Sequence, residues 1–289
     1  MMKIVENVPL FDKTSYRIGG PARFYAEPCC EEDIFEAYRF AVGRGLDVFV
    51  LGRGTNLLVS DGGVDALVLN LAAKYTFIEW DNVCVSVSGG FLLDGLALAA
   101  ARKGLSGIEE LSGIPGTIGG AVVMNAGAFD TETAHTLRSA RVLRVPALTV
   151  EMVQANDLAL GYRSSALKGK NDVVLSAVFE FTQSNAETVL SIREKILSRR
   201  REKQPLDLPS CGSVFKRPTG NYAGTLIESC GLKGFSIGGA MISQKHANFI
   251  VNTGGAKAED VRDVIQHIQQ VVYEKTGISL EPEVIFVGF

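Results

Sequence analysis

Three polar residues of this chain stand in apolar or glycine-rich surroundings where a side chain could do chemistry. Ser213 lies in PSCGSVFKRP between Gly212 and an apolar pair, Arg163 lies in LGYRSSALKG, and Glu283 heads the apolar run EVIFVG. A hydroxyl can serve as a nucleophile or a proton donor, and a guanidinium or a carboxyl can stabilise developing charge. Taken alone, the pattern favours a surface arginine at Arg163 and an exposed strand end at Glu283.

A serine hydrolase built on Ser213 is one hypothesis. The flanks of Ser213 do not form the GxSxG turn of a nucleophile elbow. Of the three histidines, His267 falls on the polar side of an expected helix and His135 lies in a loop-like stretch. A Ser-His-Asp triad would therefore depend on His246 in SQKHANFIVN, where a structural histidine is the better interpretation.

Two glycine-rich segments could approach a ligand closely. LGRGTNLLVSDGG follows an expected strand but reads GxGxxL, so Leu57 replaces the third glycine of a dinucleotide fingerprint. No GxxxxGK[ST] occurs in the chain. The segment can still offer bare backbone N–H groups and the short side chains of Thr55 and Asn56 to a phosphate.

The second segment, LSGIPGTIGGAVVMNAGAF, is predicted as a loop that Pro115 stiffens. Five of its positions from Gly113 to Gly127 are glycine. Because glycine costs ~0.5–1 kcal/mol relative to alanine inside a regular element, folding alone is a poor explanation. The two segments together favour binding of a flat ligand or a diphosphate.

The composition describes an ordinary globular protein. The chain has 289 residues, 46% hydrophobic and 21% charged, with a net charge of -3 that argues against nucleic acid. The basic run Arg199, Arg200, Arg201 and Lys203 is predicted to be the solvated end of a helix. There is neither a run of ~18 apolar residues nor a signal-peptide core, so a cytoplasmic protein without membrane contact is expected. Five cysteines without CxxC spacing predict buried thiols, with no disulfide framework and no metal site.

The periodic segments predict an α+β chain with a boundary near residues 184–205. Helices are expected at residues 31–45, 91–104, 186–203 and 257–277, the third as a polar connector. Strands are expected at residues 47–52, 83–90, 139–145, 148–153, 173–181 and 283–288. The inward faces of the first and last helices are Ile34, Phe35, Tyr38, Ala41 and Val42, and Val261, Val264, Ile265, Ile268, Val271 and Val272.

From end to end the chain resembles the UDP-N-acetylenolpyruvoylglucosamine reductase family. The resemblance rests on the ordered motifs YRIGGPARF, LGRGTNLLVSDGG, LSGIPGTIGGAVVMNAGAF, GYRSSAL, PSCGSVFKRP, AGTLIESCGLKGFSIGGAMISQKHANFIVN and LEPEV. The resemblance is to the shorter class of the family, whose members lack a tyrosine-bearing loop. Thr55 replaces a usual serine, Phe129 and Asp130 replace a usual Tyr-Gly, and the hairpin in LRVPALTVEMV lacks its usual Asp-Gly turn.

The resemblance implies an α+β fold with a two-part FAD-binding domain of the vanillyl-alcohol-oxidase type and a C-terminal α+β substrate domain. Residues 1–70 and 71–184 would be the two FAD-binding subdomains, and residues 185–289 the substrate domain. The last strand, residues 283–289, is expected to pack back on the second subdomain.

It also implies non-covalent FAD, NADPH as hydride donor and UDP-N-acetylglucosamine enolpyruvate as substrate. The matching cofactor positions are Ile18, Gly19, Gly20, Gly52, Arg53, Gly54, Thr55, Asn56, Leu57, Ser112, Gly113, Pro115, Gly116, Gly119, Gly120, Ala121, Asn125 and Gly127. Candidate substrate contacts are Tyr162, Lys216, Arg217, Asn221 and Tyr222.

The three polar residues match the catalytic positions of the family. Hydride would pass from flavin N5 to the enolpyruvyl methylene carbon, and Ser213 would protonate the carbanion as a general acid. Arg163 and a protonated Glu283 would stabilise the charge on the neighbouring carboxylate. Three alternatives stay open. They are another FAD-linked sugar or lactone oxidoreductase on the same scaffold, the serine hydrolase, and a catalytically silent nucleotide-sugar binding protein, which would leave the three polar residues without a use.

Overall fold

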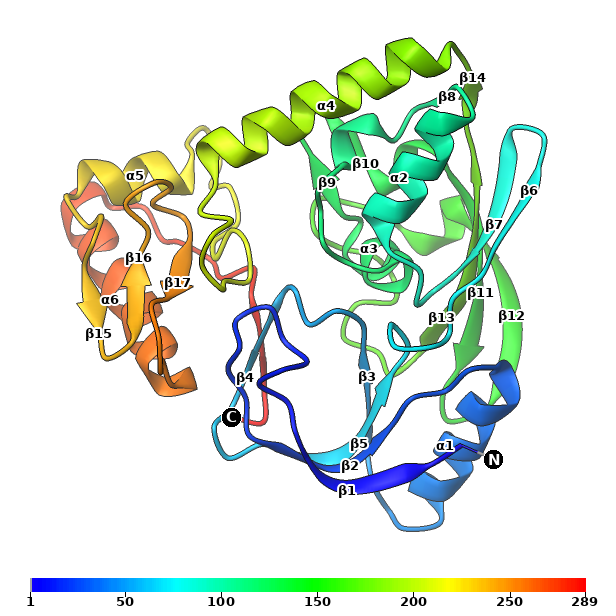
Figure 1. The fold of residues 1–289 in the computed structure, drawn as a ribbon. Helices are drawn as coiled ribbons and strands as arrows, with labels where there is room; N and C mark the ends of the chain where they lie inside the picture. The colour runs from blue at the N-terminus through cyan, green and yellow to red at the C-terminus, as the bar shows by residue number, and fades with distance from the viewer. Residues whose placement is uncertain (1) are drawn as a thin grey trace. The chain divides into compact units, whose positions relative to one another are not determined.

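The computed structural model describes residues 2–289, which form two compact units (Figure 1). The larger unit takes the N-terminal residues through Val5, Phe24–Arg53 and Ala66–Arg200; the smaller unit takes Glu6–Arg23, Gly54–Asp65 and Arg201–Phe289. Both contain helices and separate sheets, so the predicted α+β class is confirmed. The two units interleave along the chain, whereas three consecutive domains were expected; the three boundaries stay a prediction.

The first sheet has the strand order β1-β2-β5-β3. Its strands are β1 (Ile4–Pro9), β2 (Pro21–Ala26), β3 (Val48–Leu51) and β5 (Val64–Asn70), with β3 parallel to β5. Helix α1 (Glu31–Val42) buries Ile34, Tyr38 and Ala41 in an apolar cluster with residues of β3 and β5, as its periodicity predicts. Val42 was expected on that face but is 66% exposed, because it is the last helical residue before the turn at Gly43.

The second sheet is antiparallel throughout, in the order β12-β11-β13-β7-β6 (Figure 1). Its strands are β6 (Ile78–Asp81), β7 (Cys84–Ser88), β11 (Leu137–Arg144), β12 (Thr149–Gln154) and β13 (Val173–Glu180). Helices α2 (Leu93–Arg102) and α3 (Ile118–Met124) share its apolar core. The predicted strands here and helix α2 are confirmed to within two residues at each end.

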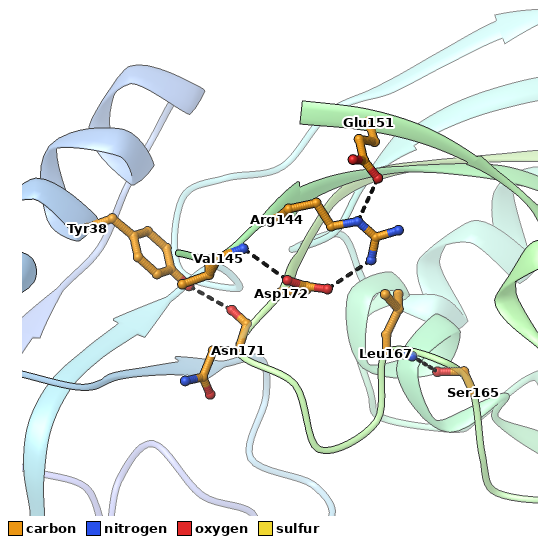
Figure 2. Close-up of polar contacts among 8 residues, drawn as sticks. All are labelled: Tyr38, Arg144, Val145, Glu151, Ser165, Leu167, Asn171 and Asp172. Atoms are coloured by element: carbon orange, nitrogen blue, oxygen red, sulfur yellow. Dashed lines mark hydrogen bonds and ion pairs between the residues drawn. The ribbon is translucent and has the colours of Figure 1, made fainter. Parts of the chain in front are cut away.

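The hairpin between β11 and β12 has no Asp-Gly turn, and side chains hold it instead. Asp172 accepts hydrogen bonds from the backbone N–H of Val145 at 3.0 Å and from Nη1 of Arg144 at 2.8 Å. Nε of Arg144 donates to Glu151 on β12 at 2.8 Å (Figure 2). The two strands pair regularly up to Arg144 and Thr149, so the altered turn leaves their register intact.

The glycine-rich segment after α2 was predicted as a loop, and this was wrong for helix α3. Oγ1 of Thr117 caps the helix by accepting the N–H of Gly120 at 3.3 Å. The N–H of Gly119 donates to the carbonyl of Gly89 at 2.8 Å, and a Cβ at Gly119 would lie 3.1 Å from that oxygen. Two glycines in the first turn hide the helix from propensity arguments, because glycine is a poor helix former.

Short elements complete the larger unit. They are β8 (Leu105–Ser106), β9 (Gly127–Ala128), β10 (Thr131–Glu132), β14 (Thr182–Gln183) and the 3-10 turns Glu109–Leu111, Thr133–His135 and Ala155–Leu158.

Helix α4 (Ala186–Lys203) was predicted as a polar connector with a solvated basic end. The helix is present, but Arg193 and Arg200 are only 8% and 9% exposed. Arg200 is therefore not solvated as predicted, whereas Arg199, Arg201 and Lys203 are exposed. None of the described helices combines the length and apolar character that a membrane span requires.

The smaller unit places helix α6 (Ala258–Thr276) against a three-stranded antiparallel sheet, β15-β16-β17 (Figure 1). The strands of this sheet are β15 (Ser236–Ile237), β16 (Ala240–Ile242) and β17 (Ile250–Asn252). The unit also contains helix α5 (Ala223–Ser229). Of the predicted inward face of α6, five residues are buried and Val271 is partly buried, which confirms the helix and its face.

The last strand of the chain pairs within the smaller unit. β18 (Ile285–Val287) lies parallel to β4 (Leu57–Val59), with Ile285 opposite Leu57. The expected packing of this strand on residues 71–184 stays a prediction. The two strands are more than 220 residues apart, so no local pattern could have selected the partner.

Candidate active site

The predicted site residues fall in both units. The smaller unit holds Ile18, Gly19, Gly20, Gly54, Thr55, Asn56, Leu57, Ser213, Lys216, Arg217, Asn221, Tyr222 and Glu283. The larger unit holds Gly52, Arg53, Ser112, Gly113, Pro115, Gly116, Gly119, Gly120, Ala121, Asn125, Gly127, Tyr162 and Arg163.

Ser213 begins a short extended segment that two other segments of the smaller unit hold from either side. The backbone N–H of Val214 donates to the carbonyl of Asn248 at 2.8 Å. The N–H of Glu283 donates to the carbonyl of Val214 at 2.7 Å. Two of the three predicted catalytic residues, Ser213 and Glu283, are therefore carried on neighbouring, hydrogen-bonded segments.

Gly212 gives Ser213 both a turn and open space. Its φ of +81° lies in the left-handed region that favours glycine. A Cβ built there would meet nothing within 4 Å. The turn explains why a glycine is needed, and the backbone at Gly212 borders open space.

Asn56 holds the strand that follows Glu283. Its Nδ2 donates to the carbonyl of Glu283 at 3.1 Å, and its carbonyl accepts the N–H of Ile285 at 2.9 Å. Within residues 2–289, the backbone N–H groups of Thr55 and Asn56 donate to no group of the chain. Two neighbouring free amides are the donors that a phosphate needs.

Several glycines predicted for the cofactor are required by the packing of the chain itself. A Cβ at Gly20 would lie 2.2 Å from a backbone oxygen, and one at Gly54, where φ is +60°, would lie 2.6 Å from another. In the larger unit, a Cβ at Gly52 would lie 2.6 Å from Oγ1 of Thr117. These glycines are explained without a ligand, so their contact with a cofactor stays a prediction.

The loop before α3 has features that chain packing does not explain. Oγ of Ser112 and Nε of Arg200 are buried without a hydrogen-bond partner among residues 2–289, and both belong to residues beside Gly113. A Cβ at Gly120 would meet only Oγ1 of Thr117, at an ordinary 3.5 Å. Because buried polar atoms without partners are rare, this loop fits a polar cofactor that approaches closely.

Arg163 occupies a strained turn in the larger unit. Its φ is +53°, a left-handed conformation that a non-glycine residue seldom adopts. The turn is closed by two hydrogen bonds between Gly161 and Ser164, at 3.0 and 3.1 Å. Nη2 of Arg163 donates to the carbonyl of Gly127 at 2.8 Å. The guanidinium is thus directed to the end of the glycine-rich segment, and its role at a substrate carboxylate stays a prediction.

Asn125 supports that turn from inside. It is fully buried, and its Nδ2 donates to the carbonyl of Gly161 at 3.1 Å and to Glu132 at 2.7 Å. Its Oδ1 accepts the N–H of Ala134 at 3.0 Å. Both side-chain protons of Asn125 are used within the chain, so its side chain is built to hold the turn of Arg163.

The predicted substrate contacts of the smaller unit lie on the loop that leads into α5. Nζ of Lys216 forms an ion pair with Glu281. The guanidinium of Arg217 lies 4.0 Å from the ring centre of Tyr222, which is 60% exposed. The N–H of Asn221 donates to Pro218 at 3.1 Å. Cations and an exposed aromatic ring on one loop suit a nucleotide ligand.

The histidines do not support a hydrolytic triad. Among residues 2–289, none of them forms a hydrogen bond with Ser213. Nδ1 of His246 accepts the N–H of Asn248 at 3.2 Å, and burial lowers its pKa. His267 stacks on Phe235 at 4.0 Å. The histidines are held by the fold, as the structural interpretation of His246 expects.

All five cysteines are free thiols. They were predicted to be buried, but Cys29 is exposed and Cys30 and Cys84 are half-buried. Cys29 and Cys30 precede α1 and lie with Asp33 so that their ligand atoms are within 4.8 Å of one another. Asp33 accepts the N–H of Cys29 at 3.0 Å, an ordinary arrangement at the start of a helix.

Two residues that support the site were missed. Asn248 contacts the Ser213 segment, and Glu281 pairs with Lys216. The only signal for Asn248 was a lone amide inside the apolar run of HANFIVN.

The chain matches known proteins along nearly its whole length. Residues 22–148 match the profile "FAD binding domain", and residues 204–287 match "UDP-N-acetylenolpyruvoylglucosamine reductase, C-terminal domain". The UDP-N-acetylenolpyruvoylglucosamine reductase of Clostridium perfringens strain SM101 is 41% identical over 285 residues, 99% of this chain and 93% of the relative. That of Caldicellulosiruptor saccharolyticus is 42% identical over 289 residues, with the same coverage of 99% and 93%.

A solved structure agrees. The crystal structure of UDP-N-acetylenolpyruvylglucosamine reductase from Thermus caldophilus superposes with a TM-score of 0.86 at 36% identity, and the match covers 99% of this chain and 100% of that one. The predicted FAD-binding fold with its distinct C-terminal domain is confirmed.

Proposed function

Because the chain belongs to the UDP-N-acetylenolpyruvoylglucosamine reductase family, we propose that it reduces UDP-N-acetylglucosamine enolpyruvate to UDP-N-acetylmuramate with NADPH. In this proposal it is a cytoplasmic UDP-N-acetylmuramate dehydrogenase of peptidoglycan synthesis, on which cell shape and division depend. FAD, when bound, would accept a hydride from NADPH and supply one to the methylene carbon of the enolpyruvyl ether.

Several of the described residues are suited to hold FAD. The free amides of Thr55 and Asn56 would bind its diphosphate. Ser112 and Arg200 each hold a buried polar atom that has no partner among residues 2–289. Gly120 leaves room for close approach. The remaining predicted cofactor positions are retained in the proposal.

Ser213 is the proposed general acid. Adding a hydride to the methylene carbon leaves carbanion character on the neighbouring carbon, which then needs a proton. A hydroxyl is a weak acid, but an enolate-like carbon is a strong base, so the transfer from Oγ of Ser213 is reasonable. The open space beside Gly212 leaves room for the substrate carbon.

Arg163 and Glu283 are the proposed stabilisers of the substrate carboxylate. As the adjacent carbon gains electrons, negative charge grows on that carboxylate. A guanidinium and a protonated carboxyl held in place before the reaction stabilise such charge without reorganising. The internal hydrogen bonds of the Arg163 turn and of the Glu283 segment provide that preorganisation.

The uridine diphosphate is proposed to contact five polar residues that are exposed or half-buried. These are Tyr162, Lys216, Arg217, Asn221 and Tyr222. Because Lys216 is paired with Glu281, a substrate phosphate would compete with that carboxylate for the ammonium group.

The observation that carries the proposal is the hydrogen bond that holds the segments of Ser213 and Glu283 side by side. The test is the visible spectrum of the purified protein under nitrogen. We expect a flavin band that NADPH bleaches and that the enolpyruvyl substrate restores, with UDP-N-acetylmuramate as the product. Acid precipitation should release the FAD into the supernatant, since the link is non-covalent.

The same experiment separates the alternatives. A sugar or lactone oxidoreductase would be bleached by its own sugar and restored by oxygen, and the enolpyruvyl compound would leave its spectrum unchanged. A serine hydrolase would show no flavin band.

A further inference from the structure

Asn248 forms three hydrogen bonds to the two residues that follow Ser213. It is 7% exposed. Its Oδ1 accepts the N–H of Phe215 at 3.0 Å, and its Nδ2 donates to the carbonyl of Phe215 at 2.9 Å. Its carbonyl accepts the N–H of Val214 at 2.8 Å. The side chain thus pairs with a backbone as a neighbouring strand would.

The hydrogen bonds of Asn248 hold one edge of the segment that follows Ser213, and the residues around Glu283 hold the other edge. On the opposite side, Val214 accepts from Glu283, and the N–H of Lys216 donates to Glu281 at 2.9 Å. Before Ser213 stands Gly212, whose missing Cβ lets the backbone turn freely. Phe215 is 1% exposed, so its N–H and carbonyl have no water to replace Asn248.

We propose that Asn248 is a positioning residue for Ser213, holding its Oγ where the proton is delivered. This rests on the proposed function. Only a primary amide of this length offers a donor and an acceptor in one fork to a single residue's backbone. Aspartate has no proton to donate, leucine forms neither bond, and glutamine is one methylene too long.

The expected effect follows from the sensitivity of proton transfer to distance. A displacement of about 1 Å can cost on the order of 10²-fold in rate. Asn248→Asp and Asn248→Leu should retain FAD and be bleached by NADPH at close to the parent rate. Their reoxidation by the enolpyruvyl substrate should slow by roughly 10–100-fold. A residue that only stabilises the fold would not slow one half-reaction selectively.

Asn252 provides a matched control. It is also 7% exposed, its Nδ2 donates to the carbonyl of Tyr16 at 3.0 Å, and its Oδ1 accepts the N–H of Gly254 at 2.9 Å. It forms no hydrogen bond to residues 213–216 among the described residues. Asn252→Asp should lower the melting temperature about as much as Asn248→Asp does. Its reduction by NADPH and its reoxidation by the enolpyruvyl substrate should each keep the same fraction of the parent rate.

A double-mutant cycle tests whether Asn248 acts through Ser213. In a Ser213→Ala background, Asn248→Leu should leave the residual reoxidation rate unchanged, because the proton donor is already gone. A second full decrease in that background would overturn the inference. So would Asn248 variants that reoxidise at the parent rate, or that lose FAD or unfold where Asn252→Asp does not.

The failure of the proposed function would look different. In that case the parent protein itself, bleached by NADPH, would not be reoxidised by the enolpyruvyl substrate. Both the function and the inference drawn from it would then fall together. A parent that completes both half-reactions beside unaffected Asn248 variants would reject the inference alone.

Discussion

The carboxylate of Asp94 accepts hydrogen bonds from both terminal guanidinium nitrogens of Arg193, at 2.5 and 3.0 Å. It also accepts the N–H of Gly113 at 2.7 Å. Burial disfavours the ionised carboxylate, but the hydrogen bonds from Arg193 and Gly113 outweigh it, so the pKa of Asp94 is lowered. The ion pair between Asp94 and Arg193 thus joins α2 to α4, and the hydrogen bond from Gly113 ties the proposed cofactor loop to the same carboxylate.

The lowered pKa of Asp94 predicts how stability depends on pH. The ionised group stabilises the fold above its unfolded pKa of about 3.9, and that contribution is lost as pH falls through the lower folded pKa. At pH 7, Asp94→Asn should lower the free energy of unfolding by about 1–2 kcal/mol, the low end for charged hydrogen bonds because the Asp94 side chain is 37% exposed.

Denaturant unfolding at several pH values measures this effect. The difference between Asp94→Asn and the parent should narrow below about pH 4. Glu180→Gln is the control, since its exposed pair with Arg138 at 2.7 Å should matter far less. An Asp94→Asn defect of constant size down to low pH would contradict the role given to the charge.

Substitution by alanine should have opposite effects on stability at Gly113 and at Gly120. At Gly113, φ is +80° and a Cβ would lie 2.8 Å from Cδ of Arg200, so Gly113→Ala should destabilise the fold by more than ~1 kcal/mol. At Gly120, helical and unobstructed, alanine should keep or raise stability by ~0.4–1 kcal/mol. If the cofactor approaches there, Gly120→Ala should nevertheless bind FAD more weakly.

Thermal unfolding of the apoprotein and FAD titration by flavin fluorescence measure the two effects separately. Unchanged FAD affinity in a fully folded Gly120→Ala protein would remove Gly120 from the cofactor site.

The sequence could predict elements whose own residues carry the pattern. The stripe from Val261 to Val272 specifies α6 because every inward position is apolar. The stretch of β13 is recognisable because β-branched residues run through it. In contrast, α3 has glycine at two positions of its first turn, and the pairing of β18 with β4 depends on a partner far away in the chain.

For the site, the sequence could supply residue types but not supports. Ser213, Arg163 and Glu283 stood out in the sequence, but their roles came from the family resemblance, because spacing alone could not distinguish a proton donor from a nucleophile. Asn248 lies 33 residues from Phe215, and its role depends on a hydrogen bond that no sequence period encodes. The interleaving of the two units along the chain likewise depends on contacts between distant segments, which no sequence period encodes.

Arg163→Lys tests the carboxylate-binding role. Lysine keeps the charge but loses the planar fork that also bonds the carbonyl of Gly127. FAD binding and reduction by NADPH should persist, while reoxidation by the enolpyruvyl substrate should slow by roughly 10²–10³-fold, as for loss of one preorganised donor. Arg138→Lys, at an exposed pair, should leave both rates unchanged. Equal slowing of both half-reactions by Arg163→Lys would contradict the assignment.

Ser213→Ala tests the general acid directly. The hydroxyl is proposed to act only after hydride transfer to the substrate, so the variant should bind FAD and be bleached by NADPH at close to the parent rate. Reoxidation by the enolpyruvyl substrate should fall by ~10²–10⁴-fold, the range for a positioned proton donor. Stopped-flow absorbance at the flavin band follows both half-reactions in one instrument.

Ser213→Cys separates a proton donor from a nucleophile. A thiol at the same place still carries a proton, so this variant should recover part of the rate that alanine loses. Oγ of Ser213 has no histidine partner among residues 2–289 to activate it, which agrees with a donor and not with an attacking oxygen. A nucleophilic serine predicts a covalent adduct, visible by intact mass, and no selective effect on reoxidation. If Ser213→Ala were reoxidised as fast as the parent protein, the general-acid role would be wrong even though the chain belongs to the family.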